Sequence, residues 1–243
     1  MESTIATVIV IFVACMVVWG IRTAKRQKEA LLQLRTRLGF SRIEDVDEAL
    51  RNRIASIAKS GKERVRVGKV FKRDEGSCTL YDCQIYSSRN KNNNSRSSVL
   101  VIPGVNLPAF RLAPCMVKSG TFAGLMRKAT QMALKQGGFS EVDVGSMPDF
   151  SAKYLLAAKE PERVRAEIPS SVWREIMALS NYFFMKGESD TIIFSVMDVT
   201  AMRGRGGFVK QEEERLSQAV RVASSLAGIF KSTKREASYA TWQ

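Results

Sequence analysis

The distribution of hydrophobic and polar residues sets one uninterrupted apolar segment apart from the rest of the chain. Residues 5–21 read IATVIVIFVACMVVWGI and contain no charged side chain. A helix of these 17 residues rises about 26 Å, which is near the lower limit for crossing a bilayer core. Trp19 lies close to the basic end of the segment, where an indole suits the lipid headgroup interface. The pattern predicts a transmembrane helix over residues 5–21.

Three other interpretations of this segment fit the sequence less well. A cleaved signal peptide has a basic start and a small-residue cleavage site, but this segment follows MEST and precedes no such site. An interfacial amphipathic helix needs a polar face, which the segment lacks. The segment could also be a buried helix of a soluble protein, although a helix that is apolar on every side is unusual at a chain terminus.

The charges that flank the segment predict its orientation. Arg22, Lys25, Arg26 and Lys28 follow it directly, whereas Glu2 is the one charged residue before it. By the positive-inside rule, we expect a single-pass protein of the inner or plasma membrane, with the N-terminus outside and the C-terminal domain cytoplasmic. The same four bases are candidates for contact with anionic headgroups, and Trp19 is the candidate interfacial anchor.

Beyond the apolar segment, several stretches repeat apolar residues at intervals of three and four. Helices are predicted over residues 22–38, 41–58, 122–136, 161–168, 170–179 and 208–230. In the second of these, Ser41 and Glu44 have the spacing of a capping box. The third has an apolar stripe formed by Phe122, Leu125, Met126, Ala129, Met132 and Ala133.

Stretches rich in β-branched and aromatic residues predict strands. They cover residues 65–72, 78–86, 98–102, 107–112, 142–144, 151–157, 182–186 and 191–196. We expect the first four to form an antiparallel meander, the polar residues 87–97 to form a loop, and the last two strands to form a hairpin. The fold class is therefore α+β, with an N-terminal transmembrane helix followed by antiparallel hairpins or a meander packed by several helices.

Charge is concentrated beside the apolar segment. The chain has a net charge of +14, and residues 22–73 contain 16 bases and 6 acids, which is +10 of that total. We therefore expect five parts: a short extracytoplasmic N-terminus (1–4), the transmembrane helix (5–21), a basic juxtamembrane helical region (22–60), a cytoplasmic α+β domain (61–231) and a flexible tail (232–243).

Composition narrows the possible chemistry. The chain has no histidine, which excludes Ser-His-Asp and Cys-His nucleophilic sets and removes the commonest zinc ligand. Cys15, Cys78, Cys83 and Cys115 have no metal-ligand spacing and are expected to be reduced thiols. We expect no catalytic residues, no metal site and no cofactor.

A few residues could still support chemistry. Glu141, Asp143, Asp149 and Tyr154 lie close in sequence and could form an acid/base group, although the same pattern is typical of a turn with local caps, which we favour. RGRGG at 203–207 could contact phosphate or RNA, but no strand–loop–helix cradle surrounds it, so a solvated loop is favoured.

The order of features resembles a group of uncharacterised single-pass bacterial membrane proteins. The resemblance lies in VLVIPGVNLPAFRLAP (99–114), EVDV (141–144), PDFSAKYLL (148–156) and EPERVRAEI (160–168), which are similar to that group's LPxFxLRPE, DIDF, PxFSxxYxLxG and VRxxF motifs. Ala113, Cys115 and Ile168 depart from the pattern. The resemblance implies an architecture, and it implies no activity or catalytic residue.

The sequence therefore favours a non-enzymatic module that is anchored in a membrane and interacts with a protein partner or a lipid surface. A membrane-tethered nucleic-acid-binding protein is the alternative, because the charge permits it. Aromatic residues are sparse in the basic region, with Phe40 and Phe71 alone between Arg22 and Arg73, so nucleic acid is not favoured. An enzyme of unfamiliar type is the third possibility.

Overall fold

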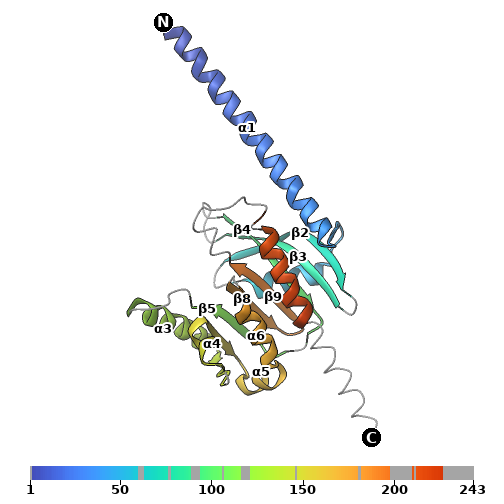
Figure 1. Cartoon of the computed structure of the whole chain (residues 1–243), viewed down its shortest axis with the longest axis vertical. Helices are drawn as coiled ribbons and strands as arrows, with labels where there is room; N and C mark the ends of the chain where they lie inside the picture. The colour runs from blue at the N-terminus through green and yellow to red at the C-terminus, as the bar shows by residue number, and fades with distance from the viewer. Residues whose placement is uncertain are drawn as a thin grey trace.

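The computed structural model contains an antiparallel sheet of nine strands and several helices within its described residues, so the chain belongs to the α+β class (Figure 1). It describes residues 2–59, 63–75, 78–88, 94–105, 107–115, 121–145, 147–179, 182–197, 210 and 212–226. Within these ranges, the side chains of residues 2–14, 94–96, 121–126, 148 and 196–197 are not described.

Helices and strands alternate irregularly along the chain. The strands are β1 (Ser41–Ile43), β2 (Arg64–Glu75), β3 (Cys78–Ser88), β4 (Asn94–Pro103), β5 (Phe110–Pro114), β6 (Ser140–Glu141), β7 (Tyr154–Ala158), β8 (Tyr182–Glu188) and β9 (Thr191–Met197). The helices are α1 (Glu2–Arg37), α2 (Glu48–Ala58), α3 (Thr121–Gln136), α4 (Pro148–Lys153), α5 (Pro161–Glu167), α6 (Ser170–Ala178) and a helix over residues 212–226.

The strand order across the sheet is β1-β2-β3-β4-β9-β8-β5-β7-β6, and the neighbouring strands pair antiparallel. Side chains alternate between the two faces of a strand, and both faces of this sheet are covered. In β4, Val99 and Val101 pack on one face, whereas Leu100 and Ile102 pack on the other. This double burial explains why β4 reads as a continuous apolar run.

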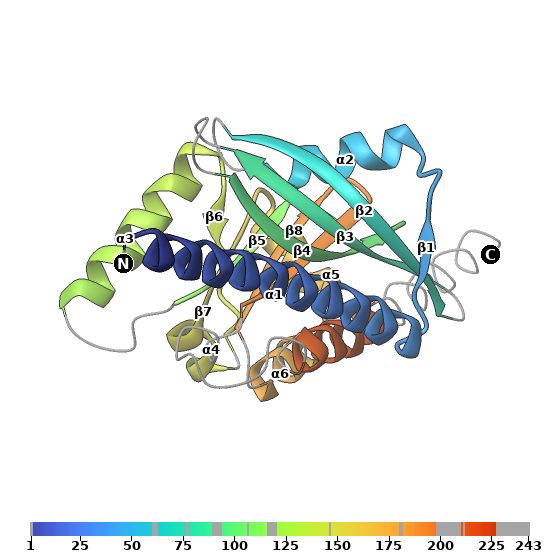
Figure 2. The same ribbon diagram turned by 90° about the horizontal axis from the view of Figure 1, so that it is seen from above.

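Helices cover the two faces of the sheet unequally. The face that includes Val99 packs against α2, through Ile54 and Ile57. The opposite face holds the larger core, which includes Trp173 of α6 and Leu216 of the helix over residues 212–226. Figure 2 shows α2 on one side of the strands, with α4, α6 and the C-terminal helix on the other side. The sheet is thus the middle layer of the domain.

Two glycines in the sheet make room for aromatic rings on neighbouring strands. Gly68 lies beneath the Tyr86 ring, and Gly187 lies opposite Phe110 and beneath its ring; a Cβ atom at either position would collide with the ring. Gly68 also lies where the register between β2 and β3 shifts, between Val67 and Val70. The glycine in the first predicted strand therefore marks a bulge covered by an aromatic ring.

The predicted helix over residues 41–58 is wrong in its first half. Residues 41–43 form β1, which pairs with β2 in the register Ser41 to Lys72. The helix begins after Asp47, whose carboxylate accepts a hydrogen bond from Ala49 N at 3.0 Å. Sequence spacing suggested Ser41 as the cap, but pairing with a distant strand overrides that local signal, and Asp47 is the cap.

Three strand predictions and one loop prediction need correction. The fourth strand is not part of a simple meander, because β5 pairs with β8 and β7 while β9 pairs with β4. The predicted loop 87–97 is shorter, because β3 and β4 extend to Ser88 and from Asn94. Residues 151–153 belong to α4, so β7 begins at Tyr154, and the short strand predicted at 142–144 lies at Ser140–Glu141.

The other predicted elements are confirmed in type. β8 and β9 form the expected hairpin, and Ser189 adopts a positive φ of 57° in its turn. Helices occupy residues 161–167 and 170–178, close to the predicted ranges. The chain is helical over 212–226, inside the predicted 208–230, and the flexible tail predicted at 232–243 lies outside the described residues.

Candidate functional site

The part of α1 that precedes the domain carries hydrophobic side chains that nothing else in the described chain covers. Met16, Val17, Val18, Trp19 and Ile21 are each at least 48% exposed, and Trp19 reaches 66%. Successive residues point about 100° apart around a helix, so this segment is apolar on every side. A helix that is apolar all round is normally buried in protein or in lipid. We call these residues, 16–21, the apolar collar.

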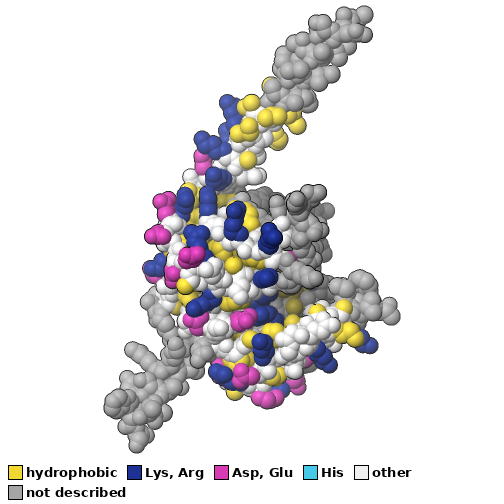
Figure 3. All heavy atoms as spheres, turned by 180° about the vertical axis from the view of Figure 1, so that it is seen from behind, with side chains coloured by type: hydrophobic (Ala, Val, Ile, Leu, Met, Phe, Trp, Pro, Cys, Tyr) yellow, Lys and Arg dark blue, Asp and Glu magenta, His cyan; other side chains and the backbone are white. Residues whose placement is uncertain are grey.

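The four predicted headgroup-contact bases lie directly after the apolar collar. Arg22, Lys25, Arg26 and Lys28 are all exposed on the next two turns of α1. Figure 3 shows basic side chains between the hydrophobic ones of the helix and the domain. Lys28 is seven residues beyond Ile21, about 10 Å along the helix, and this distance is comparable with a Debye length at moderate salt.

Within the described part of the chain, no helix is both long enough and apolar enough to cross a membrane. The predicted transmembrane segment includes residues 5–14, whose side chains lie outside the described residues. The backbone of α1 runs without a break from Glu2 to Arg37, so the apolar segment and the following basic helix form a single helix.

The last turn of α1 attaches the helix to the domain. Leu34 is fully buried, and Phe40 packs into the larger core just after the helix ends. Gly39 has a φ of 79°, and Phe40 N donates to Arg35 O at 2.9 Å, which closes the helix as a glycine C-terminal cap does. About 20 Å of exposed helix separates Ile21 from this attachment.

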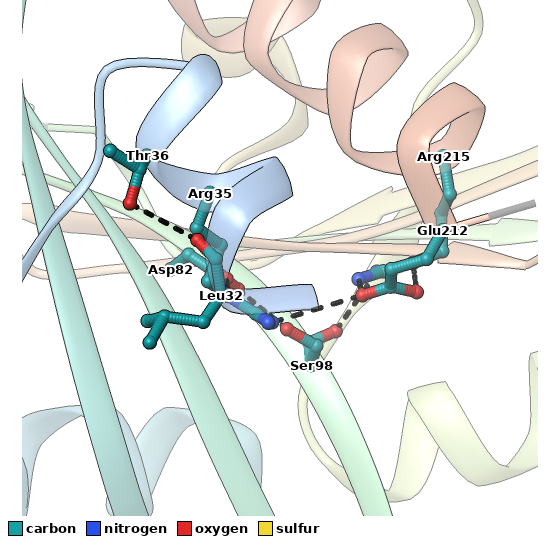
Figure 4. Close-up of polar contacts among 7 residues, drawn as sticks. All are labelled: Leu32, Arg35, Thr36, Asp82, Ser98, Glu212 and Arg215. Carbon is teal, nitrogen blue, oxygen red and sulfur yellow. Dashed lines mark hydrogen bonds and ion pairs between the residues drawn. The ribbon is translucent and has the colours of Figure 1, made fainter. Parts of the chain in front are cut away.

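Arg35 makes the central polar contact of the attachment. Its side chain is only 4% exposed, and Nε donates to Asp82 Oδ2 at 2.6 Å, while Asp82 is 1% exposed in β3 (Figure 4). The guanidinium also lies over the Phe71 ring, 4.7 Å from its centroid. A buried charge is costly unless it is paired, so Arg35 and Asp82 depend on each other.

Three more residues complete this buried network. Ser98 Oγ donates to Asp82 Oδ1 at 2.5 Å, and Arg35 lies 3.8 Å from Glu212. Arg215 donates to both carboxylate oxygens of Glu212 and to Ser98 O. Two arginines and two carboxylates balance in charge. The network joins α1 to β3, β4 and the C-terminal helix, as Figure 4 shows.

Several of the bases in the basic stretch, residues 22–73, are paired with acids of the domain. Arg37 lies 3.5 Å from Glu213, and Arg73 lies 2.9 Å from Glu75. Arg53 on α2 pairs with Asp190 of the β8–β9 turn at 2.5 Å. The positive excess beyond Leu34 is therefore partly used inside the fold, whereas the bases beside the apolar collar project from it.

The possible acid/base group does not converge on a common point. Asp143 Oδ1 accepts from Gly145 N at 2.9 Å, and Glu141 lies 2.6 Å from Arg127. Tyr154 is buried in the larger core, where its hydroxyl oxygen accepts from Phe183 N at 3.3 Å. Burial raises the pKa of Tyr154 to about 12, so this hydroxyl stays protonated at neutral pH. These side chains hold turns and strands in place.

Two of the cysteines are held as protonated thiols by their surroundings. Burial raises the pKa values of Cys83 and Cys115, so neither is activated as a thiolate. The described residues contain no group of three His, Cys, Asp or Glu side chains that could hold a metal ion. RGRGG at 203–207 and residues 89–93 of the polar loop lie outside the described residues.

A cleft of about 310 Å³ opens between the segment that follows β6 and helices α5 and α6. Its lining is largely apolar and includes Leu156, Ile168 and Trp173. Its carboxylate and its guanidinium both contact backbone, since Asp143 accepts from Gly145 N and Arg165 Nε donates to Asp143 O at 3.0 Å. The polar groups of the cleft therefore stabilise its rim.

Sequence reasoning missed the buried network, although a signal for it was present. Arg35 interrupts the apolar stripe of Leu31, Leu34 and Leu38 in its helix. Asp82 lies in the middle of the otherwise largely apolar strand LYDCQI. An arginine and a carboxylate that each occupy core positions are candidates for pairing with one another.

Comparisons of the chain with protein-family models, with curated proteins and with solved structures found no match.

Proposed function

We propose that this protein is a membrane-tethered, non-enzymatic interaction module. The apolar end of α1, residues 5–21, inserts into a bilayer as a single span. Arg22, Lys25, Arg26 and Lys28 contact anionic headgroups, and the α+β domain projects on the cytoplasmic side of the inner or plasma membrane. The N-terminus lies on the opposite side. The domain presents its surface to a protein or to the lipid, and no catalytic step is assigned to it.

One observation carries this proposal: the apolar collar is exposed on every side and is followed at once by exposed bases. In water, this surface would favour association or burial, whereas in a bilayer it needs no partner. Trp19 lies at the boundary between the apolar and basic parts, which is the position that interfacial indoles favour.

The attachment of α1 supports the same function. A flexible linker would allow the distance between the domain and the membrane to vary. In this protein α1 is a continuous helix, and near its C-terminal end Arg35 forms a buried ion pair with Asp82 of the sheet. About 20 Å of helix between Ile21 and Leu34 acts as a spacer of fixed length. The domain is therefore held near the surface in a defined orientation to the helix.

Membrane extraction of the full chain tests the proposal. The wild-type protein should stay in the membrane fraction after washing with alkaline carbonate. A variant with Val13→Arg and Val17→Arg should be released, because an arginine near the centre of a span costs about 3 kcal/mol. Leu32→Arg is the matched control, since Leu32 is exposed on the same helix but lies beyond the bases. Release of the wild-type protein by carbonate would contradict the tether.

A further inference from the structure

Helix α3 is attached to the domain by polar contacts. Arg127 lies 2.6 Å from Glu141 and also donates to Ser151 O at 2.7 Å. One turn later, Gln131 Nε2 donates to the other oxygen of Glu141 at 2.6 Å. The residues of the second half of α3 that turn toward the domain, Arg127, Thr130, Gln131 and Leu134, share one face and are partly covered.

The opposite face of α3 is apolar and exposed. Met132 is 68% exposed, and Ala129 and Ala133 are exposed beside it. These are members of the apolar stripe found in the sequence, where Phe122, Leu125 and Met126 belong to the same pattern. An amphipathic helix on a globular domain normally turns its apolar stripe to the core. Here the described part of the stripe points away from it.

The charge of α3 indicates what covers this face. The helix contains Arg127, Lys128 and Lys135 and no acidic residue. Lys128 and Lys135 are exposed and lie beside the apolar stripe, while Arg127 is used in the contact with Glu141. Apolar residues on one side with lysines beside them are typical of helices that lie in the interface of an anionic bilayer.

We infer that α3 is a second membrane contact, which lies flat on the anionic bilayer surface with Met132 and its stripe in the headgroup region. This inference rests on the proposed tether, which keeps the domain beside the membrane. Figure 1 shows α1 leaning over toward the end of the domain that carries α3, so the two helices can face the same bilayer when α1 tilts. Contacts through both α1 and α3 would fix the domain against the membrane surface, whereas α1 alone would leave the protein free to rotate about the helix axis.

Photo-crosslinking of the full chain in vesicles of phosphatidylcholine and phosphatidylglycerol tests this inference. The photoreactive residue p-benzoylphenylalanine replaces Trp19, Met132 or Glu162 in separate proteins, and the readout is the mass of lipid adducts. Trp19 reports the tether, Met132 reports α3, and Glu162 is an exposed control on α5. We expect adducts at positions 19 and 132 and none at 162.

A charge variant adds a second readout. Lys128→Glu with Lys135→Glu should lower the adduct yield at position 132 by on the order of tenfold and leave position 19 unchanged, because anionic lipid would repel the new carboxylates. Arg174→Glu is the control, since Arg174 is an exposed base on α6. Replacing the anionic lipid with phosphatidylcholine should lower the yield of lipid adducts at position 132 in the same way.

The outcomes separate the two proposals. Adducts at position 19 without adducts at 132 would overturn the α3 contact and leave the tether in place. Loss of adducts at position 19 would overturn the tether itself. Protein–protein adducts at position 132 would show that a second copy of the chain covers α3, which overturns the assignment to lipid.

Discussion

The pairing of Arg35 with Asp82 is the residue-level feature that decides how the projecting helix meets the domain. Both side chains are almost fully buried, and they lie 47 residues apart in the sequence. Replacing a buried ion pair with apolar residues is often tolerated, whereas removing one partner leaves an uncompensated charge. The contribution of each residue therefore depends on whether the other is present.

We predict that Arg35→Met lowers the free energy of unfolding by about 3–5 kcal/mol, because Asp82 remains buried without its partner. The double variant Arg35→Met with Asp82→Leu should recover most of this loss. Arg37→Met is the matched control, because the Arg37–Glu213 pair is exposed and should contribute about 0–1 kcal/mol. Urea unfolding of the full chain in detergent measures all four proteins. Equal losses for Arg35→Met and Arg37→Met would contradict the prediction.

Tyr154 makes the stability depend on pH in the alkaline range. Burial raises the pKa of its hydroxyl to about 12 in the folded protein, above the usual value of about 10 in an unfolded chain. The folded state therefore holds this proton more tightly, and stability falls as pH rises from about 10 to about 12. The loss from this residue approaches about 2–3 kcal/mol, at 1.36 kcal/mol per pKa unit.

The effect of Tyr154→Phe on the free energy of unfolding should change sign between about pH 10 and pH 12. Below pH 10 the variant should be less stable by about 1 kcal/mol, because Phe183 N loses its acceptor. Above about pH 11 it should be the more stable protein, since it has no hydroxyl to ionise. Unfolding curves of both proteins at several pH values measure the difference, in which the titration of Cys83 cancels. A difference that stays constant with pH would contradict the assignment.

At this residue scale, the sequence located the exposed groups better than the buried ones. The sequence predicts Arg22, Lys25, Arg26, Lys28 and Trp19 as surface residues from charge and hydrophobicity alone, and the structure places all five side chains in exposed positions. The partner of Arg35 could not be identified in this way, because it lies on a strand whose position in the sheet depends on the whole fold. Pairing of this kind becomes visible only when distant segments are placed together.

At the scale of elements, local pattern and long-range pairing compete in the segment before α2. Ser41 and Glu44 have capping-box spacing, yet Ser41 lies in β1 and pairs with Lys72. Asp47 caps the helix instead, through Ala49 N. The types of most elements follow from local periodicity, but the place of β5 between β8 and β7 does not, because strand order depends on contacts between distant segments.

We predict that Asp47→Ala lowers the free energy of unfolding by about 1 kcal/mol, because it leaves the first turn of α2 without its side-chain acceptor. Ser41→Ala is the control and should have a smaller effect, since the Ser41 hydroxyl makes only a 3.3 Å contact with Lys72 O at the surface. Chemical denaturation compares the two. A larger loss for Ser41→Ala would indicate that the helix begins at Ser41 after all.

At the scale of the whole molecule, exposed positive charges and those paired with acids of the domain lie in different places. The exposed bases lie beside the apolar end of α1, whereas the bases near the attachment of α1 to the domain are paired with acids. Positive charge projects beside the apolar collar, while Arg35, Arg37, Arg53 and Arg73 are balanced by acids of the domain. On the proposed topology, the bases beside the apolar collar are therefore those placed to set the orientation of the helix, because the bases of the domain lie farther from the membrane.

This distribution predicts that four residues determine which side of the membrane the domain occupies. The test replaces Arg22, Lys25, Arg26 and Lys28 with Gln and adds Glu2→Lys with Ser3→Lys. Alkaline phosphatase fused to the C-terminus should be silent on the wild-type protein and active on this variant, and a fluorescent-protein fusion should lose its signal on the variant. The control replaces the same number of exposed bases elsewhere, namely Arg42, Arg64, Arg66 and Arg174. If the control inverted the reporters equally, total charge rather than its position beside the span would set the orientation.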